Sequence, residues 1–214
     1  MSIKHRIQDT IILNNIGRKD GALLSVLVAV AATSRIRYPE GTASNWKPGR
    51  DMQDGEAFQT FLGEESESVY GKGIRLRASS PCPDPDDPSA PAKNLSHPAI
   101  MYKYVRCELV HAGKLPHTIE FRTYTDGALH TEFIASENKF VFSDNWLARL
   151  IRVVIMASEN DGSFDEERQA GIVSVELKTR FTFSREYVMA LHQQLGNSNS
   201  EAQGICDATI SFQF

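Results

Sequence analysis

Apolar residues recur at helical spacing through the first part of the chain. Residues 3–16 carry isoleucines at this spacing until Gly17 interrupts the pattern, which predicts an amphipathic helix. Asp20 can cap a second helix that is apolar on nearly every face, and Pro39 disfavours helix in the residue before it. A helix without a polar face is usually buried, so we expect this second helix at the centre of the fold.

Two more helices are marked by their start and stop signals. Asp54 opens a short helix with an apolar side, and Gly63 closes it. Ser96 and Pro98 mark the start of another helix, because proline in the first turn loses no hydrogen bond, and Gly113 ends it. The first half of the chain is therefore predicted to be helical.

After Pro116 the period of the apolar residues changes from helical to two. The alternation, with a turn signal at Asp126-Gly127, predicts three short strands, at residues 119–123, 129–134 and 140–142. Strands that follow one another through short turns pair in antiparallel fashion. We therefore expect an antiparallel β-meander.

The rest of the chain mixes both patterns. Ser143 can cap a helix with a wide apolar face, residues 173–183 alternate as a strand, Ser184 can cap another helix, and residues 210–214 indicate a last strand. Residues 79–93 hold five prolines and three aspartates, too few apolar groups to offset the entropy of ordering. We expect a flexible surface loop there.

The composition is that of one globular domain. The 214 residues are 41% hydrophobic and 23% charged, which is enough to bury one sizeable core. We predict a single domain of the α+β class over residues 1–214. It has a helical part over residues 1–113 and a strand-rich elaboration with two helices over residues 114–214.

Charge and cysteine content narrow the classes of function. A net charge of -4 argues against a protein that coats DNA or an acidic membrane, because such binding depends on clustered Lys and Arg. Three widely spaced cysteines without a CxxC pair favour a reducing compartment, so we expect a cytoplasmic protein. The apolar run over residues 22–32 is too short for a bilayer, which needs ~20 residues. Its Ala-x-Ala ending resembles a signal-peptide cleavage site, but the residues before it are longer and more acidic than a signal n-region.

One short segment, RCELVH, carries groups that suit catalysis. The chain has no GxSxG elbow, no glycine-rich phosphate loop, no HExxH and no GxGxxG. What remains is Arg106 and His111 at the end of a predicted helix. Arginine can fork onto a phosphate and histidine can transfer a proton near neutral pH, so the pair can cut RNA without a metal. The helix dipole favours a cation at His111, which suits a general acid.

The spacing of these two residues sets a geometric condition. Five residues along a regular helix correspond to about 140° around its axis, so Arg106 and His111 do not share a face. A joint site requires that His111 lies beyond the regular helix, or that a second chain completes it. The structural alternative is a histidine that bonds the last helix carbonyls and a salt-bridged surface arginine. A rival pair, Arg185 and His192, does share a helical face, but a solvated surface explains it.

Two metal sites are weaker alternatives. The aspartates of the proline-rich segment, Asp84, Asp86 and Asp87, lack the glycine and terminal glutamate of a calcium loop. A metal-dependent hydrolase would need a dispersed set of ligands: His97, His117 and His130 with Glu120 or Glu132. Although His130 and Glu132 share a strand face, the spacings fit no zinc pattern. We therefore expect no metal and no cofactor.

The order of the predicted helices resembles that of the HEPN superfamily, small helical domains of prokaryotic defence and toxin–antitoxin systems. The resemblance covers residues 1–113 and rests on GALLSVLVAVAATSRIRYP, DGEAFQTFL and YKYVRCELVHAG, the last of which contains an Arg followed a few residues later by a His. It implies a HEPN-like helical bundle core, here with an appended antiparallel β-meander. It also implies a dimer in which two motifs face each other in one metal-independent RNase cleft. Arg106 would then stabilise phosphate charge, and His111 would transfer the proton.

The resemblance leaves two functions open. The first is a metal-independent endoribonuclease of a defence or toxin type, which acts on RNA as a homodimer and is controlled by an antitoxin partner. The second is a non-catalytic binding or interaction module. It is favoured by the residue after the Arg, which is usually polar in this superfamily and is Cys107 here, a weak hydrogen-bond donor.

Overall fold

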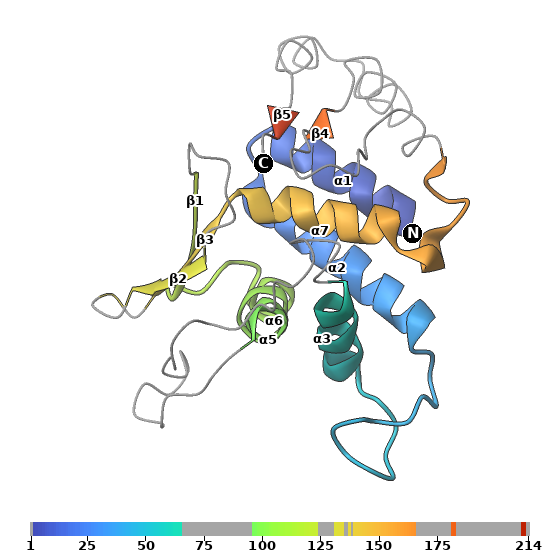
Figure 1. Cartoon of the computed structure of the whole chain (residues 1–214). Helices are drawn as coiled ribbons and strands as arrows, with labels where there is room; N and C mark the ends of the chain where they lie inside the picture. The colour runs from blue at the N-terminus through green and yellow to red at the C-terminus, as the bar shows by residue number, and fades with distance from the viewer. Residues whose placement is uncertain are drawn as a thin grey trace.

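A computed structural model describes residues 2–65, 96–123, 131–134, 137, 139–165, 181–182 and 211–212. In these residues a body of helices carries a small sheet at one side (Figure 1). The helices are α1 (Ile3–Asn15), α2 (Lys19–Arg37), α3 (Asp54–Glu64), α5 (His97–Ile100), the π-helical segment η1 (Met101–Arg106), α6 (Cys107–Ala112), α7 (Asn145–Met156) and the 3₁₀ turn η2 (Ser158–Asn160). The strands are β1 (Ile119–Arg122), β2 (Thr131–Ile134), β3 (Lys139–Ser143), β4 (Phe181–Thr182) and β5 (Ser211–Phe212).

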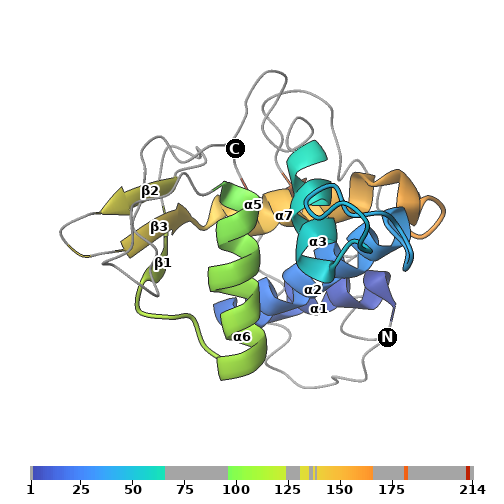
Figure 2. The ribbon, with the colours of Figure 1, turned by 90° about the horizontal axis from the view of Figure 1, so that it is seen from below.

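α2 is the central helix of the body. It contacts α1, α3 and α7, and it also touches η1 and α6 (Figures 1 and 2). Its apolar residues include Leu27 and Val30, whose side chains are fully buried. This confirms the central position expected for the helix without a polar face, because only enclosure on several sides removes so much apolar surface from water.

The turn between α1 and α2 lies where the sequence predicted it. Ser2 caps α1 by accepting the backbone N–H of His5 at 3.2 Å. Gly17 has a φ of 74°, in the left-handed region that glycine adopts without strain, and α2 begins two residues later. The chain therefore reverses at the predicted break, and α1 packs along α2.

The helix expected from Ser96 to Gly113 is present, but its winding changes along its length. Ser96 caps it by accepting the N–H of Ala99 at 3.3 Å, and Gly113 ends it with a φ of 69°. Between these ends, Met101–Arg106 is π-helical, and the N–H of Cys107 donates to the carbonyl of Tyr102. Such a segment adds a residue to the turn and rotates the side chains that follow, which the sequence pattern did not predict.

The sheet corrects the predicted fold class. Its strand order is β1-β3-β2, with β2 antiparallel to β3 but β1 parallel to β3, so that Ile119 lies opposite Phe140. The antiparallel β-meander, and with it the HEPN-like bundle with an appended meander, was therefore wrong. The prediction assumed that strands adjacent in sequence pair with each other. Instead β3 takes the middle position, because Val141 and Phe142 point to opposite faces and are both buried.

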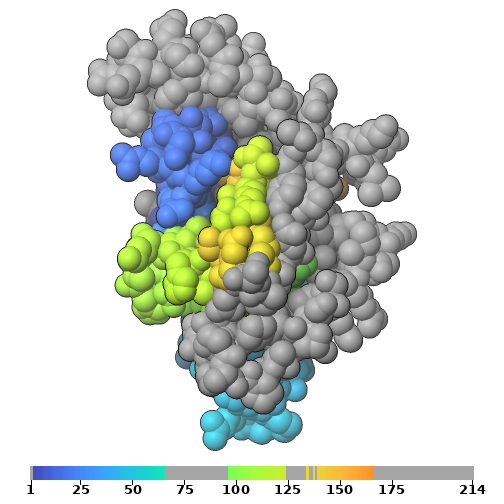
Figure 3. Space-filling view, turned by 90° about the vertical axis from the view of Figure 1, so that its left-hand side faces the viewer, coloured from blue at the N-terminus to red at the C-terminus, as the bar shows by residue number. Residues whose placement is uncertain are grey.

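The core draws on both predicted parts of the chain. α7 comes from the region expected to be an elaboration, yet it packs against α2, and its Trp146 and Ile151 are buried together with Phe164. Figure 3 shows the strands (yellow-green to yellow) beside both the first helices (blue) and the α5–α6 helix (green). The sheet therefore flanks one shared core.

Several expectations fall partly or wholly outside the described residues. The proline-rich segment 79–93 and the helix expected from Ser184 lie outside them, as does the pair Arg185 and His192. Of the strands expected at residues 173–183 and 210–214, β4 and β5 are described, and they pair in antiparallel fashion. No helix within the described part of the chain has the length and hydropathy needed to cross a membrane.

Candidate functional site

Arg106, the first candidate residue, is half-buried at the end of η1. Its Cζ lies 5.4 Å from the centroid of the Tyr102 ring, a cation–π contact, and its buried Nε has no hydrogen-bond acceptor among the residues that the structure describes. No carboxylate of the described residues forms an ion pair with it. The charge of the guanidinium is therefore not neutralised by any described carboxylate and can bind an external anion.

Tyr102, whose ring contacts this guanidinium, lies against the start of α3. A Cβ atom at Gly55 would lie 2.8 Å from Cε1 of Tyr102, so the absence of a side chain there lets the ring approach. The Phe58 ring packs beside it, with ring centroids 5.4 Å apart. Burial, aided by the nearby Cys107 and Asp54, raises the pKa of Tyr102 despite the opposing charge of Arg106. The ring is a fixed, neutral support for the guanidinium.

His111, the second candidate residue, is exposed on α6 and is not brought together with Arg106. α6 is a regular α-helix that contains His111, so the five-residue offset places the two side chains about 140° apart around the axis. Val110, next to His111, is also exposed, at 46%. The condition that His111 lies beyond the regular helix is not met, so a joint site needs a second chain.

The residues of the alternative metal sites are not assembled in the described part of the structure. His117 is exposed on the loop before β1, whereas His97 is buried, and His130 lies outside the described residues together with the three aspartates of the proline-rich segment. Among the residues that are described, no group of three or more His, Cys, Asp or Glu side chains is arranged so that it could hold a metal ion. Cys107 is a free, half-buried thiol.

His97 is enclosed by aromatic rings. Its ring centroid lies 5.5 Å from that of Trp146 and 6.5 Å from that of Phe142, both edge-on. Its Nδ1 is buried and lacks a hydrogen-bond partner within the described residues. Burial lowers the pKa of His97 to about 4, so the imidazole is neutral at pH 7 and packs as part of the core.

A feature that the sequence did not reveal is the loop of residues 42–52, here called the Trp46 loop. Ala43 and Asp51 form an isolated antiparallel bridge at its base. The N–H of Ser44 donates to the carbonyl of Arg50 at 2.8 Å, and that of Met52 to the carbonyl of Thr42 at 2.7 Å. The loop is therefore a closed hairpin-like structure, and it protrudes from the body (light blue, bottom of Figure 1).

Glu56, in the first turn of α3, fixes the Trp46 loop from inside. The residue is 3% exposed, and its carboxylate accepts hydrogen bonds from Ser44 Oγ at 2.6 Å, from the N–H of Asn45 at 2.6 Å and from the N–H of Trp46 at 3.0 Å. Burial alone would raise the pKa of Glu56, but these hydrogen bonds outweigh it and lower the pKa. The glutamate is therefore a buried anion satisfied by the loop.

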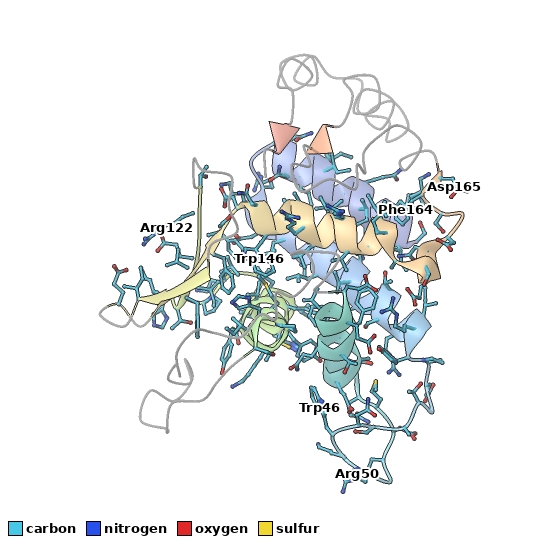
Figure 4. All side chains as sticks on the ribbon, viewed as in Figure 1. Trp46, Arg50, Arg122, Trp146, Phe164 and Asp165 are labelled. Atoms are coloured by element: carbon cyan, nitrogen blue, oxygen red, sulfur yellow. The ribbon has the colours of Figure 1, made fainter. Side chains whose placement is uncertain are left out.

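The ring of Trp46 is not enclosed by this anchor. Its side chain is 55% exposed, although its backbone N–H is held by Glu56. Lys47 and Arg50, which follow it in the loop, are exposed as well, and Figure 4 shows Arg50 at the lower end of the loop. The sequence carried one signal for this arrangement, a tryptophan among Asn, Lys, Pro, Gly and Arg, where turn residues place it on the surface.

Comparison with known proteins gives one match. A model of the Rv1289 family matches residues 2–184, which is most of the chain. The chain belongs to the Rv1289 family. No curated protein and no solved structure matches it significantly. The region shared with the Rv1289 family contains the Trp46 loop, α3 and the segment η1 that carries Arg106. The HEPN resemblance stays a prediction.

The buried His97 predicts a specific loss of stability in acid. Its folded-state pKa of about 4 lies below the ordinary 6.5, so the unfolded chain binds a proton in that window and the folded chain does not. The free energy of unfolding should fall by about 3 kcal/mol from pH 6.5 to 4 through this residue. In urea unfolding across this range, the free energy of unfolding of His97→Phe should depend less on pH than that of the wild type. His117→Gln is the exposed control, and an unchanged pH dependence in His97→Phe would contradict the assignment.

Glu56 predicts how the Trp46 loop responds to loss of one charge. Glu56→Gln keeps the size of the side chain but removes its charge, and the amide N–H₂ group in place of Oε2 meets Ser44 Oγ, which already accepts two backbone N–H groups. Hydrogen exchange at the amides of Asn45 and Trp46 should accelerate by about tenfold or more. In the wild type, whose Glu56 pKa is lowered, protection should persist at neutral pH and disappear only below the ordinary glutamate value of ~4.3.

The control for the loop is Glu64→Gln, at the other end of α3. Glu64 is an exposed carboxylate that pairs with Arg37 and does not touch the Trp46 loop. Its substitution should leave exchange at Asn45 and Trp46 unchanged. Equal exchange in both variants would mean that Glu56 does not hold the loop.

Proposed function

We propose that this protein binds single-stranded RNA at Arg106 and does not cut it as a single chain. The observation that supports the proposal is the state of the guanidinium, which has no ion-pair partner among the described residues and is supported by Tyr102. Arginine binds phosphate through two parallel hydrogen bonds, and a guanidinium that is already held in place loses less entropy on binding. Arg106 is thus suited to a backbone phosphate.

Of the two functions left open by the sequence, the non-catalytic module fits the geometry better. A single chain places His111 on another side of the helix from Arg106, so a phosphate bound at Arg106 lies away from the imidazole. Cys107 occupies the position after the Arg, where the HEPN resemblance would favour a polar residue. A net charge of -4 favours a local contact with RNA over coating along its length. The cysteine content favours a reducing compartment, so the proposed ligand is a cytoplasmic RNA.

An endoribonuclease completed by a second copy is the other candidate. It is favoured by Val110, an apolar residue that is 46% exposed beside His111 and that a second copy would cover. In such a homodimer Arg106 of one copy would hold the phosphate, and His111 of the other would transfer the proton. An antitoxin that covers the same surface of α6 would prevent this assembly.

Loss of Arg106 should weaken RNA binding. In fluorescence anisotropy with a labelled single-stranded RNA, Arg106→Ala should bind about five- to tenfold more weakly and should lower the salt-dependence slope by ~0.7. Arg122→Ala is the matched control, because Nε of Arg122 already pairs with Glu120 Oε1 at 2.6 Å on the sheet (Figure 4). Equal binding by Arg106→Ala and the wild type, or an equal loss in Arg122→Ala, would contradict the proposal.

Mixing two variants separates the binding module from the dimeric nuclease. A composite site takes Arg106 from one copy and His111 from another, so Arg106→Ala and His111→Ala proteins should each be inactive and should regain metal-free RNA cleavage when mixed. The binding module instead predicts no cleavage by the wild type, with EDTA present to exclude contaminating metal-dependent nucleases. Cleavage by the wild type that both single variants retain would contradict both candidates.

A further inference from the structure

We propose that the Trp46 loop is a second contact for single-stranded RNA, in which the Trp46 ring stacks on a base while Lys47 and Arg50 contact the adjacent phosphates. This inference rests on the proposed RNA binding, because it assigns a further part of the same interaction. Base–aromatic stacking together with cationic groups along the backbone is the usual way in which proteins bind single strands without a fixed sequence.

The exposure of Trp46 is the first observation behind this proposal. The chain has two tryptophans, and they are in opposite environments: Trp146 is 1% exposed in the core, whereas Trp46 is 55% exposed (Figure 4). An indole left in water forgoes a large gain from burial, and tryptophan is one of the residues that dominate binding surfaces. In the space-filling view the region that carries it protrudes at the lower end of the molecule (Figure 3).

The second observation is that the loop is already in place before anything binds. The N–H of Trp46 donates to both Glu56 Oε1, at 3.0 Å, and Ser44 Oγ, at 3.2 Å, and the N–H of Lys47 donates to Ser44 Oγ at 2.8 Å. These bonds fix the backbone at the tip and leave the ring outside. A loop that is fixed in this way loses little entropy when a ligand orders its side chains.

The charge around the ring selects the kind of partner. Lys47 and Arg50 are exposed at the tip, and the Arg50 side chain forms no ion pair with any described residue. Glu56 lies inside the loop with its oxygens occupied by N–H and O–H donors, and Asp51 lies at the base rather than the tip. A flat apolar ring on the same loop as two exposed cations complements a nucleobase and its neighbouring phosphates.

Two neighbouring residues of α3 connect this loop to Arg106. Gly55 is in contact with Tyr102, which supports the Arg106 guanidinium, and Glu56 holds the N–H of Trp46. Both elements are therefore positioned by the same first turn of α3, seen beside the α5–α6 helix in Figure 2. A single strand that binds at Arg106 would have a second, pre-formed contact on a loop anchored to the same turn of α3 that Tyr102 contacts.

Fluorescence of the full chain tests the assignment. Titration with a short single-stranded oligouridylate should quench wild-type emission, because a stacked base quenches Trp46. It should leave emission nearly unchanged in Trp46→Phe, which retains only the buried Trp146.

By anisotropy, Trp46→Ala should bind roughly 5- to 100-fold more weakly, as expected for one stacked base. Trp46→Phe should lose less RNA affinity than Trp46→Ala, because phenylalanine still stacks on a base. Thermal melts of the three proteins should coincide, since Trp46 is exposed.

The outcomes separate this inference from the proposed function. If the wild type binds no RNA, both fail together. If Arg106→Ala weakens binding while Trp46→Ala binds as the wild type does, only the role of the Trp46 loop is overturned. If Trp46→Ala weakens binding and Arg106→Ala does not, the loop is supported and the role of Arg106 is overturned. Quenching by vesicles of acidic phospholipid, with RNA affinity unaffected by Trp46→Ala, would make the loop a membrane contact and overturn the inference.

Discussion

The enclosure of α2 is the constraint on which the rest of the structure depends. A helix whose apolar side chains cover nearly its whole circumference is stable only when other elements surround it, and α1, α3 and α7 provide that cover. Because α3 is packed against α2, its first turn has a fixed position. Gly55 and Glu56 in that turn then determine where Tyr102 and the Trp46 loop lie. The candidate binding elements are thus a consequence of how the core is filled.

Local signals in the sequence predicted several helix ends, although Asp20 and Ser143 lie one or two residues from the N-caps that the structure shows, Arg18 and Asp144. Sheet order could not be predicted from such signals. Gly17, Ser96 and Gly113 act within one or two turns of chain, and the structure places helix ends at each of them. Sheet order depends on which strand can be covered on both faces. Here that strand is β3, whose Val141 and Phe142 are buried on opposite faces, and β1 pairs with it in parallel. A turn signal between neighbouring strands does not indicate which strand will be covered on both faces.

The candidate residues were predictable in identity but only partly in arrangement. The spacing of Arg106 and His111 showed that one regular helix separates them, and α6 is regular. The π-helical segment before it has no pattern in the sequence. The role of Glu56 was hidden because an acidic residue in the first turn of a helix already has a local explanation in the helix dipole. Its actual partners lie 10 to 12 residues earlier in the chain.

Binding of single-stranded RNA around the first turn of α3 is the central claim, and photo-crosslinking tests it most directly. RNA that contains 4-thiouridine, irradiated in complex with the full-length wild-type chain and digested, should label peptides that contain Trp46 and peptides that contain Tyr102 and Arg106. Adducts confined to α1 or to the sheet around Arg122, or the absence of any adduct, would contradict the claim.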